Sequence, residues 1–286
     1  MMSEDYQFLS SHLLDSSGLS LGPGKEYLLE ARLVPLAQSW GLNDIQELVQ
    51  ALRKGQDKQL MAAVTEAMTT NETSFFRDKS PFEDLKEHLL PALMEARKLS
   101  RTLRIWCAAS SSGQEPYSLL MLINDHFPSL LKDWQLEFIA TDISNNILMR
   151  AEAGVYTQFE VQRGLPVRYL LKHFSQQPSG WEIEKRIRDK IEFRPFNLLR
   201  DSAPFGRFDL ILCRNVMIYF DAPTRARLFS RLRRQMAQDG ALMLGGAETV
   251  LGMTTEFTPT RETPNFYRPA PIALAPERQR IASFAK

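Results

Sequence analysis

Cysteine and histidine are scarce in this sequence of 286 residues, which contains two Cys and four His. Cys107 and Cys213 lie far apart and are flanked by apolar residues, so a disulfide scaffold is disfavoured and we expect buried free thiols. The chain has no CxxC pair, and its His residues form no local metal motif. These absences argue against a zinc site, and we expect no metal.

Long hydrophobic runs and a strong net charge are also missing. No apolar run approaches the ~20 residues of a membrane-spanning helix. The first residues, MMSEDYQF, are acidic and lack the apolar core of a signal peptide. The formal net charge of +1 gives no electrostatic argument for nucleic acid or an anionic membrane. We expect a cytoplasmic protein that binds no nucleic acid and does not insert into a membrane.

The composition is ordinary for a soluble globular protein, with 44% hydrophobic and 24% charged residues. The charge is uneven, however. Residues 1–78 contain 6 Lys and Arg against 11 Asp and Glu, a net charge of 6 − 11 = −5, so the remainder carries 1 − (−5) = +6. This asymmetry predicts two units of different character in a chain long enough for two moderate domains.

The first 70 residues show four helical patterns and no strand pattern. Gly18, Gly41 and Gly55 end three of them, as glycine commonly does at helix C-termini. We therefore predict a small all-α N-terminal domain over residues 1–78.

A fifth helix is predicted over residues 79–98. Ser80 is suited to be its N-cap, Pro81 to be its first helical residue, and Glu83 to complete a capping box. Pro91 is expected to bend or interrupt this helix, which we take to join the two domains.

From Leu103 onward, apolar runs of strand length alternate with helical patterns. Such alternation predicts a doubly wound, mostly parallel sheet of the Rossmann-like type over residues 99–268. The charged stretch GWEIEKRIRDKIEF is better suited to small exposed antiparallel strands, so we predict an inserted β-subdomain over about 157–190. EFTPTRETPNFYRP is expected to form an antiparallel hairpin that closes the sheet, and residues 269–286 a flexible tail.

Ligands of an open α/β sheet bind outside the carboxyl ends of its strands. The first such end, ASSSGQEPYS, has a single Gly and no G-x-G-x-x-G, which disfavours a dinucleotide. Glu115 follows there, as N-cap and pocket residue, and Asp142 ends the second strand, where a carboxylate can accept both ribose hydroxyls. Asn197 and Asn215 follow the third and fourth strands. The set favours S-adenosylmethionine over NAD.

Each of these residues also has a plainer interpretation. Asp142 could cap the helix that follows it, and Asn215 could be an ordinary turn residue. We favour the cofactor interpretation because several strand ends carry the set together.

Four blocks closely resemble the signature segments of the CheR-type chemotaxis receptor methyltransferases: TTNETSFFRD, RIWCAASSSGQEPYSLLM, ATDISNNILMRAEAGVY and FDLILCRNVMIYF. The order of parts is similar too, and the resemblance covers about residues 5–268. It implies an enzyme that transfers a methyl group from S-adenosylmethionine to glutamate side chains of the helical cytoplasmic domain of bacterial chemoreceptors. The products would be glutamate methyl esters and S-adenosylhomocysteine.

The resemblance also implies roles for individual residues. Asn71, Thr73 and Arg77 match the family's N-x-T-x-F-F-R, which lines the cofactor and substrate cleft, and Tyr219 matches a cleft tyrosine. The remaining matches, all at the cofactor, are Glu115, Asp142, Asn197, Leu198, Asn215 and Val216.

A glutamate substrate has an unperturbed pKa near ~4.3, so it is already an anion at pH 7 and needs no general base. We expect Arg77 to hold that carboxylate bidentately, with Phe75 and Phe76 fixing the backbone around it. The short loop SQQPSGWEIEKR predicts independence from a receptor tethering peptide, and we expect a monomer. A methyltransferase for RNA or a small molecule, and a non-catalytic binder of cofactor or receptor, are the alternatives.

Overall fold

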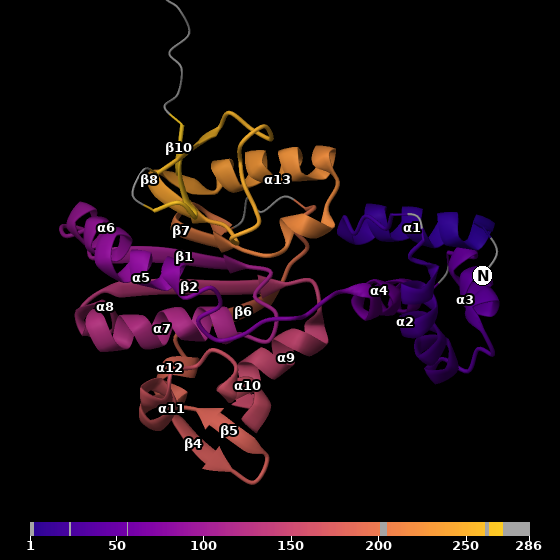
Figure 1. Ribbon diagram of the computed structural model, residues 1–286, viewed down its shortest axis with the longest axis horizontal. Helices are drawn as coiled ribbons and strands as arrows, with labels where there is room; N and C mark the ends of the chain where they lie inside the picture. The colour runs from indigo at the N-terminus through magenta and orange to yellow at the C-terminus, as the bar shows by residue number, and fades with distance from the viewer. Residues whose placement is uncertain (1–2, 23, 56, 201–204, 261–262, 271–286) are drawn as a thin grey trace, which may run out of the picture.

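The computed structural model describes residues 3–22, 24–55, 57–200, 205–260 and 263–270, and four helices form its N-terminal part (Figure 1). These are α1 (Ser3–Ser17), α2 (Glu26–Ser39), α3 (Ile45–Arg53) and α4 (Lys58–Met68). Their apolar faces bury a cluster of their own, which includes Leu9, Leu33, Leu48 and Val64. The N-terminal part is therefore an all-α unit with its own core, as the sequence predicts.

The next helix begins at Ser80, although its predicted cap is wrong. It consists of α5 (Ser80–Asp84), the π-helical turn η1 (Leu85–Leu89) and α6 (Leu90–Ala96). Ser80 is the first helical residue and no side-chain cap forms, because the preceding Lys79 adopts a left-handed conformation with φ 45°. Glu83 pairs with Lys86 instead of closing a capping box. The interruption predicted at Pro91 is the π-helical turn directly before α6. Proline has no N–H to donate to the preceding turn, and the wider π-helical turn lies at that point.

Within the described residues, seven strands form one sheet in the order β6-β2-β1-β7-β8-β10-β9. The first five of these run parallel, and β10 and β9 add an antiparallel hairpin beside β8. This confirms the predicted sheet and its closing hairpin. The strands are β1 (Thr102–Ala108), β2 (Gln135–Asp142), β6 (Glu192–Pro195), β7 (Phe208–Cys213), β8 (Met236–Met243), β9 (Phe257–Pro259) and β10 (Phe266–Pro269).

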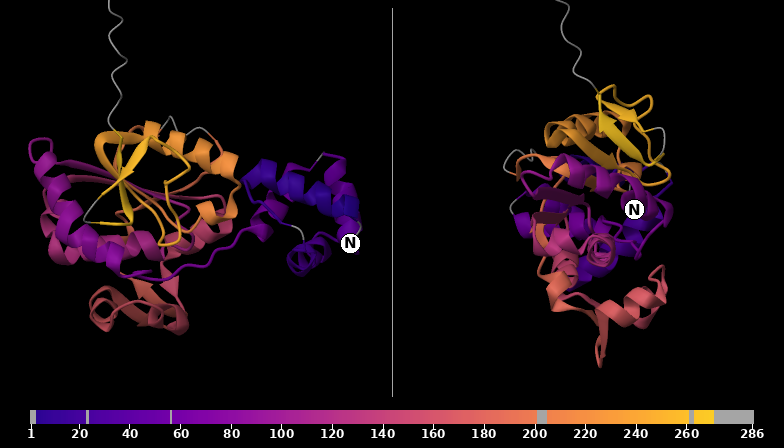
Figure 2. Two further views of the ribbon diagram at one scale, coloured as in Figure 1. Left: turned by 45° about the horizontal axis from the view of Figure 1, so that its top comes forward. Right: turned by 90° about the vertical axis from the view of Figure 1, so that its left-hand side faces the viewer.

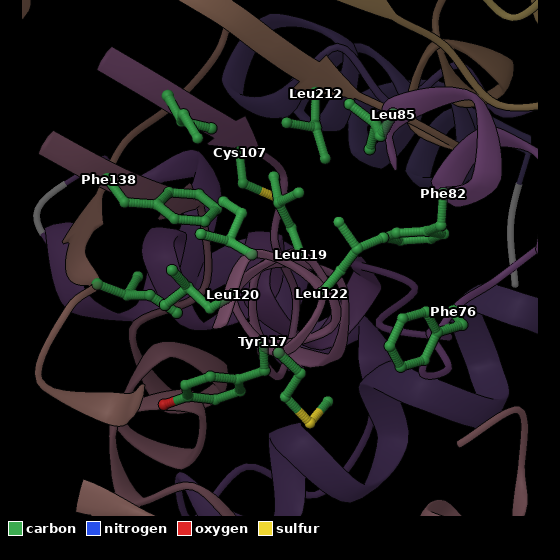
Figure 3. Close-up of a cluster of buried hydrophobic side chains, with 14 of the residues drawn as sticks. Phe76, Phe82, Leu85, Cys107, Tyr117, Leu119, Leu120, Leu122, Phe138 and Leu212 are labelled. Carbon is green, nitrogen blue, oxygen red and sulfur yellow. The ribbon is translucent and has the colours of Figure 1, made fainter. Parts of the chain in front are cut away.

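Helices cover both faces of this sheet (Figures 1 and 2). Alternate residues of β1 point to opposite sides, so Ile105 and Cys107 enter one buried cluster and Trp106 and Ala108 the other. The first cluster contains α5, α6, α7 (Gln114–His126) and α8 (Pro128–Lys132), and Figure 3 shows it around α7. The second contains α13 (Ala222–Arg234). The expected linker helix is thus packed against the sheet, and Cys107 and Cys213 are buried free thiols as predicted.

A small subdomain is inserted between α9 (Asn145–Ala153) and β6. It contains β3 (Val155–Tyr156), α10 (Gln158–Gln162), α11 (Val167–His173), β4 (Phe174–Gln177), β5 (Gly180–Ile183) and α12 (Lys185–Arg188). Its three strands are antiparallel, as predicted, in the order β3-β5-β4. Of the stretch GWEIEKRIRDKIEF, which is predicted to suit small antiparallel strands, Gly180–Ile183 forms β5, but Lys185–Arg188 is helical. Ile183, Ile187 and Ile191 recur every four residues, a spacing that also suits a helical turn, and α12 forms there.

Two further points bear on the predicted organisation. The predicted tail lies outside the described residues from residue 271 onward. In the part of the chain that the structure describes, no helix is both long enough and apolar enough to span a bilayer.

Candidate active site

A pocket lies at the carboxyl ends of β1, β2 and β7, the edge at which ligands of such sheets bind. Its walls come from the loops after the strands, from Ser17 and Leu19 of the N-terminal part, and from the junction at residues 69–77. The structure brings all the predicted site residues together in its lining: Asn71, Thr73, Arg77, Glu115, Asp142, Asn197, Leu198, Asn215, Val216 and Tyr219. They converge because parallel strands end at the same edge of the sheet.

Asp142 is the last residue of β2, and its carboxylate is buried beneath the pocket. Its two oxygens accept hydrogen bonds from the backbone N–H groups of Ser111 at 2.9 Å and Ser144 at 3.1 Å. Burial raises the pKa of Asp142, and those N–H groups oppose the rise. Asp142 does not cap α9, because the Ser144 hydroxyl accepts the N–H of Ile147 instead. A carboxylate with about four acceptor positions retains capacity for a ligand diol.

Glu115 lies in the first turn of α7, and the prediction that it is the N-cap is wrong. Gly113 occupies the cap position with φ 89°, a conformation that glycine adopts without strain. The Glu115 carboxylate instead accepts a hydrogen bond of 2.5 Å from the Arg214 guanidinium and one of 3.3 Å from the Cys107 thiol. The pocket therefore holds a carboxylate beside a buried cation.

Arg214 is the residue of this pocket that the sequence analysis missed, and only 1% of its side chain is exposed. Besides Glu115, its guanidinium binds the carboxylate of Asp78 at 2.7 Å and the main-chain oxygen of Arg77 at 3.0 Å. Burial alone would lower its pKa, but the two carboxylates outweigh burial and raise it, so the group stays charged. The available sequence signal was a charged residue directly after the apolar strand FDLILC.

Glu248 is a second residue that the sequence analysis missed. Its carboxylate accepts four backbone N–H groups at 2.8–2.9 Å, from the loop after β7 and from the loop after β8. The loop after β7 carries Asn215 and Val216, and Asn215 adopts φ 56° there. The glutamate thus fixes the backbone that presents these two residues to the pocket.

Asn197 connects the pocket to the N-terminal helices. Its amide group donates to the main-chain oxygen of Ser16 at 2.6 Å, and its amide oxygen accepts the N–H of Leu199 at 2.9 Å. Glu66 of α4 makes a similar connection, because it accepts the Ser144 hydroxyl at 2.5 Å and the N–H of Asn146 at 3.0 Å. The all-α unit is therefore hydrogen-bonded to two of the loops that form the pocket.

Arg77 and Tyr219 are half-buried in the pocket wall. The Arg77 guanidinium donates to the main-chain oxygen of Glu72 at 3.2 Å, and no ion pair joins it to a carboxylate among the described residues. Tyr219 ends the 3₁₀ turn η3 (Met217–Tyr219), and its main-chain oxygen accepts the N–H of Ser20 at 2.9 Å. Both side chains therefore remain available to a ligand.

These features define a class of enzyme. A mostly parallel doubly wound sheet with an acidic residue at the end of β2, a glycine-poor first loop and a pocket at the strand ends is the arrangement of an S-adenosylmethionine-dependent methyltransferase.

Comparison with known proteins shows the family, and the chain belongs to the CheR methyltransferases. The family model described as CheR methyltransferase, SAM binding domain, matches residues 71–266, and the one for the CheR all-alpha domain matches residues 4–69. Chemotaxis protein methyltransferase 1 of Pseudomonas aeruginosa is 40% identical over 249 residues, 86% of this chain and 90% of that protein. Chemotaxis protein methyltransferase Cher2 of Pseudomonas putida is 37% identical, over 88% of this chain and 93% of that protein. The chemotaxis protein methyltransferase of Escherichia coli is 30% identical, over 88% of this chain and 87% of that protein.

Proposed function

We propose that this chain transfers the methyl group of S-adenosylmethionine to glutamate side chains of a chemoreceptor's cytoplasmic helices. The observation that carries the proposal is the contrast between two arginines. Arg214 is committed to Glu115 and Asp78, whereas Arg77 lines the same pocket with no carboxylate partner among the described residues. A guanidinium with free donors in a cleft is suited to bind an incoming carboxylate bidentately.

The residues of the pocket fit the cofactor. The Asp142 carboxylate suits a ribose diol, and the Glu115 carboxylate, which Arg214 holds in place, suits the ammonium of a methionine group. Asn197, Leu198, Asn215 and Val216 line the same pocket and are proposed to surround the adenine and the methyl-transfer region. When bound, the cofactor supplies a methyl group on a sulfonium, which is a good leaving group.

What the chain itself contributes is orientation and exclusion of water. The carboxylate substrate is ionised at pH 7, and the described lining of the pocket contains neither His nor Cys to act as a base. Arg77 holds the carboxylate in line with the methyl group, which converts the encounter into an oriented, effectively unimolecular step. Tyr219 positions the same carboxylate or packs on the methyl group, and the buried Phe75 and Phe76 keep water from that wall.

The test is transfer of labelled methyl from S-adenosylmethionine to a purified receptor cytoplasmic domain. A receptor whose methylatable Glu are replaced by Ala serves as the control, and label that persists on it would indicate another acceptor. Arg77→Ala is expected to lower the rate by at least about 100-fold, because the oriented carboxylate is lost. S-adenosylhomocysteine binding, measured by calorimetry, should persist at least in part.

Arg53→Ala provides a matched control, because Arg53 lies in α3 outside the pocket and 46% of its side chain is exposed. It should leave the rate within about twofold, as expected for a surface substitution. A fully active Arg77→Ala enzyme would contradict the assigned role of Arg77.

We further propose that the enzyme acts without a receptor tethering peptide. Gln177 of β4 pairs with Gly180 of β5, so a turn of only two residues, Pro178 and Ser179, joins the two strands. This supports the view that the subdomain lacks an extended loop to hold a peptide. Calorimetric titration with a receptor C-terminal peptide should give no detectable heat, and binding with a micromolar or lower Kd would overturn this proposal.

The remaining proposals concern location and oligomeric state. Residues of one chain, from both the all-α unit and the sheet, form the pocket, which supports a monomer as the active species. The proposed acceptor is the cytoplasmic domain of the receptor, so the enzyme is proposed to act in the cytoplasm. Sedimentation at assay concentration tests the proposed monomer, and an active enzyme found only as a dimer would contradict it.

A further inference from the structure

The turn that carries Arg77 is strained. Phe76, Asp78 and Lys79 adopt φ angles of 46°, 69° and 45°, so left-handed residues lie on both sides of Arg77. This region costs free energy for residues other than glycine, and a strained segment persists only where its surroundings hold it. The contacts that hold this turn therefore decide where the Arg77 guanidinium lies.

One set of contacts comes from the main methyltransferase unit. The N–H of Phe76 donates to the Ser118 hydroxyl of α7 at 2.9 Å, and the oxygen of Arg77 accepts from Arg214. These bonds fix the backbone on the sheet side of the turn. They leave its other side to whatever packs on the two phenylalanine rings.

The inserted subdomain packs on both rings. Tyr169 of α11 stacks on Phe76 with ring centroids 4.8 Å apart and planes at 26°, and it also stacks on His173 at 5.9 Å and 23°. His173 is fully buried, and its Nε2 lies 3.1 Å from the carboxylate of Asp125 in α7. Three stacked rings thus connect the turn to an anchored histidine.

Phe75 is enclosed by the same subdomain. Its ring makes edge contacts with Tyr156 at 4.9 Å and Phe174 at 5.6 Å. Gly164, in the loop between α10 and α11, approaches so closely that a Cβ there would lie 2.1 Å from the Phe75 oxygen. The subdomain therefore contacts the backbone as well as both rings of the segment before Arg77.

We propose that the inserted subdomain is a positioning element of the active site, and that Tyr169 is the residue through which it places Arg77. Tyr169 is buried and does not line the pocket, so it acts through Phe76 rather than on substrate. The inference rests on the proposed role of Arg77 in holding the carboxylate. It assigns the subdomain a part in the chemical step that is independent of any peptide it could bind.

The test compares three variants of α11 in the labelled-methyl assay. Tyr169→Leu fills much of the volume without the ring and should lower kcat about tenfold or more, because small displacements of an orienting group cost up to about 100-fold. Tyr169→Phe keeps the stack and should stay within about twofold of the parent. Leu171→Ala, on the exposed side of the same helix, is the matched control and should also remain active.

Binding of S-adenosylhomocysteine distinguishes a positioning role of Tyr169 from a merely structural one. General damage to the fold would weaken cofactor binding as well as kcat, whereas loss of positioning lowers kcat alone. Its Kd should change less than about threefold in Tyr169→Leu, because no residue of α11 lines the pocket. An equal fall in cofactor affinity and kcat, or a loss of activity in Tyr169→Phe, would overturn the proposal. If Tyr169→Leu fails to fold, Tyr169→Met gives the same comparison with another flexible apolar side chain.

A double variant separates this inference from the proposed function. In an Arg77→Lys background with residual activity, Tyr169→Leu should lower kcat much less than in the parent. The reason is that the planar guanidinium group that Tyr169 is proposed to orient is absent there. Equal effects in both backgrounds would show that Tyr169 does not act through Arg77. If Arg77→Ala is itself fully active, the proposed function of Arg77 fails; if only the Tyr169 variants are unaffected, the inference alone fails.

Discussion

The clearest prediction concerns Glu248, whose carboxylate joins two loops of the site through backbone N–H groups. One carboxylate oxygen accepts from Asn215 and Gly245, and the other from Val216 and Met217. Glu248→Gln keeps the shape but replaces one oxygen with an amide group that donates. Two N–H groups then face a donor instead of an acceptor.

The expected cost follows from those two bonds. A hydrogen bond to a charged group contributes about 1.5–3 kcal/mol, so the loss of two bonds lies between about 3 and 6 kcal/mol. Glu248 is 9% exposed, so water compensates little, although relaxation of the loops favours the lower end. A loss of about 3 kcal/mol is a large part of the 5–15 kcal/mol that keeps a typical protein folded.

Urea unfolding of Glu248→Gln beside Glu152→Gln is the assay. Glu152 is exposed on α9, so its variant should change the free energy of unfolding by less than about 0.5 kcal/mol. In Glu248→Gln, the Kd for S-adenosylhomocysteine should also rise by at least about tenfold, because the displaced loop carries Asn215 and Val216, which line the pocket and are proposed to bind the cofactor. A Glu248→Gln protein within about 0.5 kcal/mol of the parent would refute the reasoning.

Two further predictions test other contacts. Gly164→Ala should lower the free energy of unfolding by about 2–5 kcal/mol in urea, because φ is 88° there and the new Cβ meets the Phe75 oxygen; an unchanged midpoint would contradict the close approach. The hydrogen bonds from Arg97 lower the pKa of Asp239 in the folded protein. The pair therefore stabilises the fold fully above the usual Asp pKa near ~3.9, and this stabilisation is lost as the pH falls through the lowered pKa of the folded state. Thermal unfolding should therefore show Asp239→Asn less stable than the parent at neutral pH and converging with it as the pH falls below the usual Asp pKa, and a gap that stays constant with pH would contradict this.

The predictable part of the structure depends on patterns that are local in sequence. The strands have continuous apolar runs, and their polar end residues meet in one pocket because parallel strands share an edge. Gly18, Gly41 and Gly55 correctly marked where helices of the all-α unit end, since a left-handed terminal residue is a local property. The junction residues Asn71, Thr73 and Arg77 were predicted from the family resemblance alone, because they lie in a segment without helical or strand periodicity.

The missed residues depend on contacts between distant segments. Glu248 binds the loop after β7, and Arg214 binds the junction, in each case through hydrogen bonds that leave no repeat in the sequence. The expected caps at Ser80 and Glu115 failed for a related reason. Each side chain has cap chemistry, but a left-handed residue before the helix, Lys79 or Gly113, leaves no side-chain cap at either start. Tertiary geometry overrode a correct local preference.

The charges of the site explain why two arginines can lie in one pocket with different tasks. Arg214 is buried and its pKa is raised by Glu115 and Asp78, so its charge is already balanced before a substrate arrives. A receptor carboxylate gains little from such a group, because it is buried and both of its terminal nitrogens are already hydrogen-bonded. The residues on either side of Arg77 have a strained backbone, and this turn is held from two sides. Arg214 and Ser118 hold it from the sheet, and Tyr169 holds it from the inserted subdomain. Arg214 thus orients the backbone of Arg77, as the proposed alignment of a substrate carboxylate by Arg77 requires.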